Sequence, residues 1–535
     1  METAMQRTFD YVIAGAGSAG CVLANRLSEG TGAPHVALLE AGGPDTAPEI
    51  RIPFAFHELF KTEYDWNYTT TPQKELCGRE LYWPRGKTLG GSSSLNAQMW
   101  IRGHRADFDG WAESCPGWSY DVVAPYFRRA ERRAGSNADG VYGSSGPLWI
   151  SELRSPSPVT RAFLRAAEDL GLTRSGELNQ PDNTGFFATP VTQRRGRRWS
   201  TADAYLRPAL SRANLHLVTT AHVQRVLLDG TRAIGVEYRD TDGQIRRVGA
   251  RREVILSAGS IGSPQLLMLS GIGDTAHLRH IGITVRCALP GVGRNLQDHL
   301  AVGVYRHCPR PVTAAVGADS VLSLLRYYLA KRGKLTSNIG EAVSFIRSDP
   351  GLSAPDLELA FAPLPYIDHG FGSPATHGIS IGAVLMLPKS SGRITLASPD
   401  AAVSPVIDPH YLEDQADLDT LIVNVRLAER LLNTNALRLY AGAPMDPYPG
   451  PVGDDELGKY IRAHSQTLYH PVGTCRMGTD DNAVVDPWLR VRGVHGLRVV
   501  DASVMPRITR GHVHAPTVMI AERAADFIRD TEAAG

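Results

Sequence analysis

The sequence has no long hydrophobic run, no excess of charge of one sign and no paired cysteines. Its 535 residues carry 56 Lys and Arg against 55 Asp and Glu, a formal net charge of +1, which argues against nucleic acid as a partner. Apolar runs are short and broken by glycine or charge, so we expect no transmembrane segment. The N-terminus has no apolar signal core, so we expect a cytoplasmic protein. A peripheral position at the inner membrane stays open.

The six cysteines are too scattered to form a framework. They stand at positions 21, 77, 115, 287, 308 and 475, without a CxxC pair. Neither a disulfide scaffold nor a metal site is therefore expected. A chain of this length usually forms two or three structural units.

The segment 9–40 has the pattern of a strand, a glycine turn, a helix and a second strand. Gly15 suits a tight turn, Gly17 lets the backbone approach a pyrophosphate, and Gly20 lets the helix pack closely on the strand. Glu40, at the end of the second strand, suits hydrogen bonds to the hydroxyls of an adenosine ribose and disfavours NADP. This pattern predicts dinucleotide binding but leaves open which dinucleotide.

A second glycine-rich stretch covers residues 85–100. Its small side chains and free backbone N–H groups suit a loop that lies against a flat ring or a phosphate. Asn96 is a candidate hydrogen-bond partner for the cofactor. A flexible linker is the alternative, but the apolar residues of this stretch are too regularly spaced for one. The aromatic region before it is predicted to cover a cofactor.

Two later regions carry further signals. A buried strand at 252–259 runs into a helix and could touch the cofactor at its end. The basic run 194–198 reads as a solvated loop, with an acidic substrate or partner as the alternative. Residues 311–465 change character, with alternating segments typical of antiparallel strands and a helix at 416–435.

The C-terminal section holds the candidate catalytic residues. His470 precedes a proline, which favours an extended backbone and fixes the direction of the imidazole. His512 and His514 come just before a helix predicted at 517–529, with Pro516 at its first position. If 511–515 is extended, both histidines share one face.

These segments resemble the glucose-methanol-choline (GMC) oxidoreductases, FAD enzymes that oxidise alcohols. Residues 86–100 and 259–273 look like the two signatures of the family, and His470 with 511–522 looks like its active site. The resemblance implies that His470 is the catalytic base and His512 its partner. His514 is then expected to support the cofactor, although the choice between His512 and His514 stays open.

The resemblance also bears on cofactor attachment and substrate. Some relatives attach FAD through a histidine where this chain has Leu95, so noncovalent FAD is implied. Glu341 lies where choline-specific relatives carry an acid, and we name it with Leu468 and Tyr469 as substrate residues. Residues 335–341 lack the cysteine of the photodecarboxylase branch.

The resemblance implies an α/β fold, α+β overall, with a Rossmann-like FAD-binding domain and a substrate-binding domain built on an antiparallel sheet backed by helices. We assign 1–155, 200–310 and 466–535 to the first domain, and 156–199 and 311–465 to the second. The residues expected to contact FAD are Gly15, Gly17, Ser18, Ala19, Gly20, Glu40, Ala41, Trp66, Arg85, Gly86, Leu89, Gly90, Gly91, Ser92, Asn96, Ala97, Met99, Val223, Ala258, Gly259, Asp501, Ala502, His512, Val513 and His514.

The function implied is oxidation of an alcohol, with a primary alcohol preferred, by proton abstraction to His470 and hydride transfer to the flavin. The alternatives are a lyase of the same fold, which cleaves cyanohydrins, and a flavin-binding protein without turnover. Oxygen and a quinone or dye both stay open as the electron acceptor, as do the alcohol and the oligomeric state.

Overall fold

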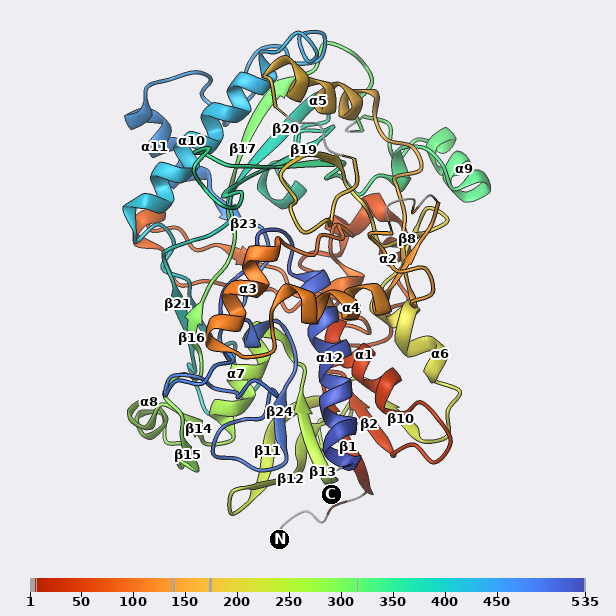
Figure 1. The fold of residues 1–535 in the computed structure, drawn as a ribbon, viewed down its shortest axis with the longest axis vertical. Coiled ribbons are helices and arrows are strands. Elements are labelled where there is room, and N and C mark those ends of the chain that lie inside the picture. The colour runs from red at the N-terminus through yellow and green to blue at the C-terminus, as the bar shows by residue number, and fades with distance from the viewer. Residues whose placement is uncertain are drawn as a thin grey trace.

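Two sheets organise the chain (Figure 1). The computed structural model describes residues 5, 7–135, 137, 140–172, 176–314 and 316–533. Figure 1 shows a mixed sheet in the lower half of the view and an antiparallel sheet in the upper half. Within the described ranges, no helix has both the length and the apolar character needed to cross a membrane.

The lower sheet has seven strands and is parallel at its centre. β1 pairs in parallel with β2 and β13, β2 pairs in parallel with β10, and β24 pairs in parallel with β13. β11 and β12 continue the sheet as an antiparallel extension. The strands are β1 (Arg7–Ala14), β2 (Val36–Leu39), β10 (Leu215–Val218), β11 (His222–Asp229), β12 (Arg232–Arg239), β13 (Ile245–Leu256) and β24 (Leu497–Val499).

The first glycine turn joins β1 to α1 (Ser18–Leu27), as the sequence predicts. β2 is buried along its whole length, because both faces of a central parallel strand are covered. α12 (His514–Ala533), from the other end of the chain, packs beside α1, and the guanidinium of Arg26 lies 2.8 Å from the carboxylate of Glu522. Both ends of the sequence therefore build the same half of the molecule.

The upper sheet has six strands in the order β23-β17-β20-β19-β18-β7, all antiparallel. α10, α11 and α5 lie around it in the upper half of Figure 1. The fold class predicted from the sequence is thus confirmed. The strands are β7 (Gly185–Ala188), β17 (Leu300–His307), β18 (Ala342–Ile346), β19 (Leu357–Ala362), β20 (Gly378–Leu385) and β23 (Gln466–Thr467), and the helices are α5 (Pro158–Asp169), α10 (Gln415–Leu432) and α11 (Asp454–His464).

β17 and β23 lie in the upper sheet, although the predicted boundaries assign their residues to the cofactor domain. The boundaries themselves stay a prediction.

The remaining helices and strands lie outside the two main sheets. The helices are α2 (Pro48–Arg51), α3 (Arg105–Ser114), α4 (Tyr120–Ala130), α6 (Arg207–Ala209), α7 (Gly259–Leu269), α8 (Thr275–His280) and α9 (Val321–Ala330). The short strands are β3 (Tyr68–Thr69), β4 (Tyr82–Trp83), β5 (Glu131–Arg133), β6 (Leu148–Ile150), β8 (Gln193–Arg194), β9 (Arg197–Arg198), β14 (Ile272–Gly273), β15 (Cys287–Ala288), β16 (Arg294–Leu296), β21 (Gly392–Thr395) and β22 (Val406–Asp408).

Two local predictions are wrong. α12 begins at His514, so 511–515 is not one extended segment and Pro516 is the third residue of the helix. Proline is tolerated there because the first-turn N–H groups have no acceptor within the helix. The basic run is not wholly solvated either, since Arg198 is buried and donates to the backbone oxygens of Ile50 and Ser93.

Candidate active site

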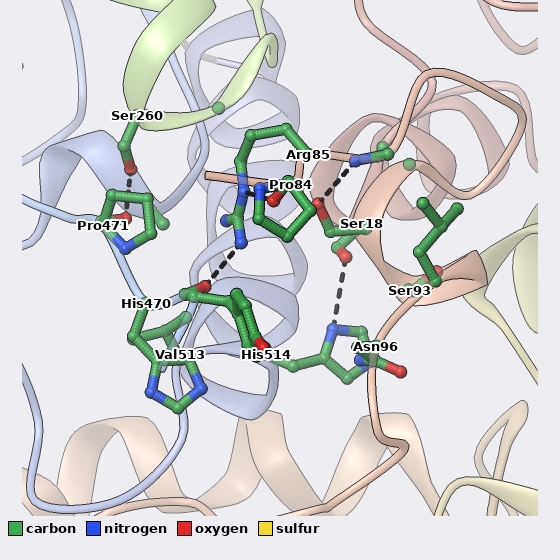
Figure 2. Close-up of a pocket in the computed structure, with 18 of the residues that line it drawn as sticks. Ser18, Pro84, Arg85, Ser93, Asn96, Ser260, His470, Pro471, Val513 and His514 are labelled. Atoms are coloured by element: carbon green, nitrogen blue, oxygen red, sulfur yellow. Dashed lines mark hydrogen bonds between the residues drawn. The ribbon is translucent and has the colours of Figure 1, made fainter. Parts of the chain in front are cut away.

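A cavity of about 370 Å³ lies where the two halves of the molecule meet. Its wall combines the first glycine turn, the stretch 84–99, strands of the upper sheet and the C-terminal segments. Figure 2 shows His470 and Pro471 on one side and Ser93 and Asn96 on the other, with a dashed line that joins His514 to Ser18. Segments at opposite ends of the sequence therefore form one site.

Most residues predicted from the sequence reach this cavity. Every predicted cofactor residue lines it except Gly20, Leu89 and Gly90, and the predicted substrate residues Leu468 and Tyr469 line it as well. Glu341 does not. Its carboxylate is buried and accepts hydrogen bonds from the Ser157 backbone N–H, the Thr160 hydroxyl and the Ser337 hydroxyl.

The backbone around His470 is held by one buried carboxylate. Asp298 accepts the backbone N–H of His470 at 2.7 Å and the hydroxyl of Thr467 at 2.6 Å. Tyr469, just before the histidine, has a φ of 69°, in the left-handed region that only a well-supported side chain adopts. These contacts fix the position of the imidazole.

The ring of His470 is oriented by a second histidine, His299. Nε2 of His299 lies 3.0 Å from the backbone oxygen of Met386, and its Nδ1 lies 2.9 Å from Nδ1 of His470. A carbonyl oxygen can only accept, so Nε2 of His299 carries the hydrogen. Burial lowers the pKa of His299 to about 3, which keeps the ring neutral and leaves Nδ1 as an acceptor.

His470 must therefore donate from Nδ1. Burial, followed by the nearby His512, His299 and Arg85, holds the pKa of His470 well below its ordinary value. The ring is neutral, its hydrogen is on Nδ1, and the lone pair on Nε2 is not used by His299. This is the arrangement of a proton acceptor.

His512 stands beside His470, with ring centroids 4.6 Å apart. Its Nε2 lies 2.9 Å from Oε1 of Glu358, a fully buried carboxyl group on β19. When this pair has no net charge, either the imidazolium faces a carboxylate or a neutral imidazole accepts from a carboxylic acid. In both forms Nδ1 of His512 carries a hydrogen, so it can donate to a substrate oxygen.

His514 has a different environment. Its Nδ1 lies 3.2 Å from the hydroxyl of Ser18, the first residue of α1. Burial lowers its pKa to about 4. His514 thus joins the N-termini of α1 and α12, away from the His470–His512 pair.

Comparison with known proteins identifies the family to which the chain belongs. The GMC oxidoreductase N-terminal model matches residues 9–301, and the C-terminal model matches residues 388–521. The chain belongs to the GMC oxidoreductases. It is 50% identical to an uncharacterized GMC-type oxidoreductase of Mycobacterium tuberculosis, over 98% of this chain and 100% of that protein.

Two further relatives of this GMC oxidoreductase have more specific names. It is 42% identical to human mitochondrial choline dehydrogenase, over 97% of this chain and 90% of that protein. The crystal structure of pyridoxine 4-oxidase from "Mesorbium loti" superimposes with a TM-score of 0.89 at 33% identity, over 97% of this chain and 99% of the other. The resemblance predicted from the sequence is therefore confirmed, and the enzyme is an FAD-dependent oxidoreductase.

The glycine turn fits the FAD that the family requires. A Cβ added at Gly15 or Gly20 would lie 2.5 or 1.9 Å from a backbone oxygen, so both positions need glycine for packing. A Cβ added at Gly17 would meet nothing closer than 3.9 Å, and Gly17 faces the cavity. The open side of the turn, next to the N-terminus of α1, suits a pyrophosphate.

The side chains of Glu40 and Asn96 both accept hydrogen bonds from other groups of the protein. The two oxygens of Glu40 accept the backbone N–H groups of Ala16 and Gly42, at 2.8 and 2.9 Å. Burial raises the pKa of Glu40 to about 7. The side-chain oxygen of Asn96 accepts from Arg198 at 2.8 Å and from the N–H of Gln98 at 3.0 Å. Both side chains still line the cavity where the cofactor is expected.

Sequence reasoning missed His299, Asp298 and Glu358. Asp298 and His299 stand at the end of a polar loop, immediately before β17. The sequence pattern of this loop indicates no function. Polar residues at the start of a buried strand are a signal that could have singled them out. Glu358 gave a weaker signal, an acid within the alternating apolar pattern of β19.

Proposed function

We propose that this GMC oxidoreductase oxidises a primary alcohol to the aldehyde with noncovalently bound FAD. FAD, when bound, supplies the acceptor for the hydride that leaves the substrate carbon. The observation that carries the proposal is the hydrogen-bonded chain Met386–His299–His470, from which we infer that the lone pair on Nε2 of His470 is available.

Each group of the site has a role in this proposal. His470 takes the hydroxyl proton at Nε2, because the C–H bond of an alcohol donates hydride readily only as its oxygen becomes an alkoxide. His512 donates from Nδ1 to the same oxygen and holds it in place. Asp298 keeps the His470 backbone fixed, and Glu358 maintains the hydrogen on His512.

The proposed substrate is an uncharged alcohol with an apolar or aromatic body. One part of the cavity wall is apolar and aromatic, since Phe56, Phe60, Ile339 and Tyr366 line the cavity and pack in one cluster. Among the described residues of the wall, the carboxylates are Glu40 and Asp501, which belong to the expected cofactor contacts. An alcohol without a cation therefore fits this end best.

Choline is the second candidate. Human choline dehydrogenase is a relative at 42% identity, and aromatic rings can bind a quaternary ammonium group through their faces. The aromatic part of the wall supports this candidate, while Glu341 does not, because it lies outside the cavity.

Noncovalent attachment and the acceptor complete the proposal. Leu95 lines the cavity where some relatives attach FAD, and its side chain has no nucleophile. Oxygen and a quinone are both retained as acceptors, since the residues of the site support either. We place the enzyme in the cytoplasm.

The test is anaerobic reduction of the bound flavin by benzyl alcohol, a linear alkanol and choline. We expect benzyl alcohol or the alkanol to remove the absorbance of oxidised flavin, and His470→Ala to slow the reduction by about 10²- to 10⁴-fold. His307→Ala, at an exposed histidine outside the wall, serves as the matched control. Reduction at the wild-type rate in His470→Ala contradicts the assigned base. If no alcohol reduces the flavin, cleavage of mandelonitrile would indicate the lyase, and its absence a binding protein.

A further inference from the structure

The helix α9 exposes an apolar surface that the proposed reaction does not use. The exposed fractions are 74% for Val321, 77% for Leu322, 51% for Leu325, 57% for Tyr328 and 83% for Leu329. Figure 1 shows α9 at the right of the view, standing away from the two sheets. Leu324, 37% exposed, makes a sixth. Exposed apolar side chains are normal when isolated, but a group of six on one helix is typical of an interaction site.

One residue anchors this helix to the rest of the protein. Tyr327 is the buried residue of α9, and its hydroxyl donates to the backbone oxygen of Arg51 at 3.2 Å. Its ring packs with Leu335 and Ala318. Because the anchor lies on one side, the leucines of the helix are presented outward.

Positive charge surrounds this apolar surface. Residues 321–334 contain Arg326, Lys331, Arg332 and Lys334 and no acid, although Asp319 stands before the helix. The hairpin of β8 and β9 adds exposed Arg195 and Arg197. Its Gly196 lies against the backbone oxygen of Lys331, where an added Cβ would come within 2.8 Å. The basic run 194–198 and α9 are thus parts of one surface.

We infer that α9 and the neighbouring hairpin dock the enzyme on a membrane surface that contains anionic lipids. A ten-residue helix is about 15 Å long, too short to span a bilayer, but its leucines can enter the headgroup region while it lies in the plane. The arginines and lysines around it then face lipid phosphates.

A second copy of the chain fits this surface less well. A two-fold contact through α9 would bring the cations of both copies together, because each copy presents the same patch. Like charges opposed in this way disfavour the contact, whereas an anionic bilayer neutralises them.

The docked orientation would place the membrane near the cavity. Shortly after α9, residues 338–340 form part of the cavity wall, and the intervening Lys334–Thr336 turn contacts both α9 and the segment Pro53–Leu59. An apolar molecule dissolved in the bilayer would therefore be delivered close to the site. This inference goes beyond the proposed function and does not depend on turnover.

The test is sedimentation of the FAD-loaded enzyme with vesicles. We expect binding to phosphatidylcholine vesicles that contain phosphatidylglycerol, weaker binding to phosphatidylcholine alone, and release by salt. Leu322→Ser and Leu329→Ser should each lower the partition coefficient about tenfold. Arg197→Gln and Arg332→Gln should each lower it about fivefold at low salt.

The control is the double variant Leu352→Ser/Leu439→Ser. These two leucines lie outside α9, and their side chains are 40% and 50% exposed. It should bind vesicles as the wild type does, and all variants should keep the wild-type rate with a soluble dye acceptor. Absence of vesicle binding by the wild type, or unchanged binding after the α9 substitutions, overturns the inference. A dimer in light scattering that Leu322→Ser/Leu329→Ser dissolves also overturns it, in favour of a contact between copies. If none of the alcohols reduces the flavin, the proposed function is wrong, but the result of the vesicle experiment still holds.

Discussion

Nδ1 of His470 lies 2.9 Å from Nδ1 of His299, and this contact determines which nitrogen of His470 is basic. Two nitrogens at this distance share one hydrogen. The Met386 carbonyl requires the hydrogen of His299 on Nε2, so the shared hydrogen belongs to His470. Without this chain, both tautomers of His470 would be populated and the lone pair would not be confined to Nε2.

Substitution of His299 should therefore reduce catalysis without removing the base. His299→Leu cannot accept the hydrogen, and we expect it to slow flavin reduction about ten- to a hundredfold, less than the loss of His470 itself. His299→Asn can still accept through its side-chain oxygen and should recover most of the rate. Stopped-flow reduction under anaerobic conditions measures both, with FAD content and thermal midpoint recorded for each variant.

A merely structural role for His299 predicts a different result. In that case the flavin reduction rates of His299→Asn and His299→Leu would fall in proportion to the loss of thermal stability or of FAD content in each variant. Equal rates in the two variants, at equal FAD content, would contradict the assignment of the tautomer.

Glu358→Gln should weaken the donor role of His512. The amide oxygen of glutamine can accept from Nε2 of His512, which leaves Nδ1 without a hydrogen. We expect kcat to fall about tenfold or more, with a smaller change in KM, because the bond to the substrate oxygen strengthens as the alkoxide forms. Steady-state kinetics with a dye acceptor measure the effect. Because the NH2 group of glutamine can also donate to Nε2, Glu358→Leu is measured beside it, and an unchanged kcat in both variants would show that Glu358 does not set the proton on His512.

Glu341→Gln offers the matching control on a second buried carboxyl group. Glu341 lies outside the cavity and accepts from three protein donors, so the variant should lose about 1–3 kcal/mol of stability. We expect kcat and KM for each alcohol, choline included, to stay within about threefold of the wild type, below one kcal/mol. A selective rise in KM for choline would restore Glu341 as a substrate residue.

The sequence was sufficient where local chemistry decides the structure. Gly15 and Gly20 act at short range, through a tight turn and a close helix, so their spacing predicts the first strand, turn and helix. The antiparallel strands of the second sheet follow from alternation. His470 and His512 were predicted as catalytic residues because their segments resemble those of a known family, and this assignment stays a prediction.

The sequence was insufficient where contacts join distant segments. His299 and His470 are 171 positions apart, and His512 and Glu358 are 154 apart. No spacing rule links such pairs. The antiparallel pairing of β17 with β23 brings His299 and His470 together, and the segment before α12 brings His512 to Glu358 on β19. The position of Glu341 outside the cavity wall has the same origin, because its carboxylate accepts hydrogen bonds from Ser157 and Thr160, which stand at the start of α5 about 180 positions earlier.

The glycines of the first turn should respond differently to alanine. In Gly20→Ala the new Cβ would lie 1.9 Å from the backbone oxygen of Gly15. We therefore expect the free energy of unfolding to fall by about 3 kcal/mol or more, which is the upper end for overpacking. Little folded protein should be recovered. Gly17→Ala has space for its Cβ and should fold, but the methyl group would occupy the side that faces the cavity. We expect its FAD affinity to fall about tenfold or more, measured by fluorescence titration of the apoprotein. Equal FAD affinity in Gly17→Ala and the wild type would contradict the location of the pyrophosphate.

The buried histidine His299 should also make stability depend on pH. Its pKa is about 3 in the folded protein against 6.5 for an ordinary histidine, so the unfolded chain binds a proton between these values and the folded chain does not. Stability from this residue is present above pH 6.5 and is lost as the pH falls. Between pH 7 and pH 5 the loss is about 2 kcal/mol. His299→Asn has no such group, so its thermal midpoint should fall by about 2 °C less than that of the wild type over this range, at saturating FAD. Parallel midpoints for the two proteins would show that folding does not lower the pKa of His299, which would contradict its assignment as a neutral acceptor for His470.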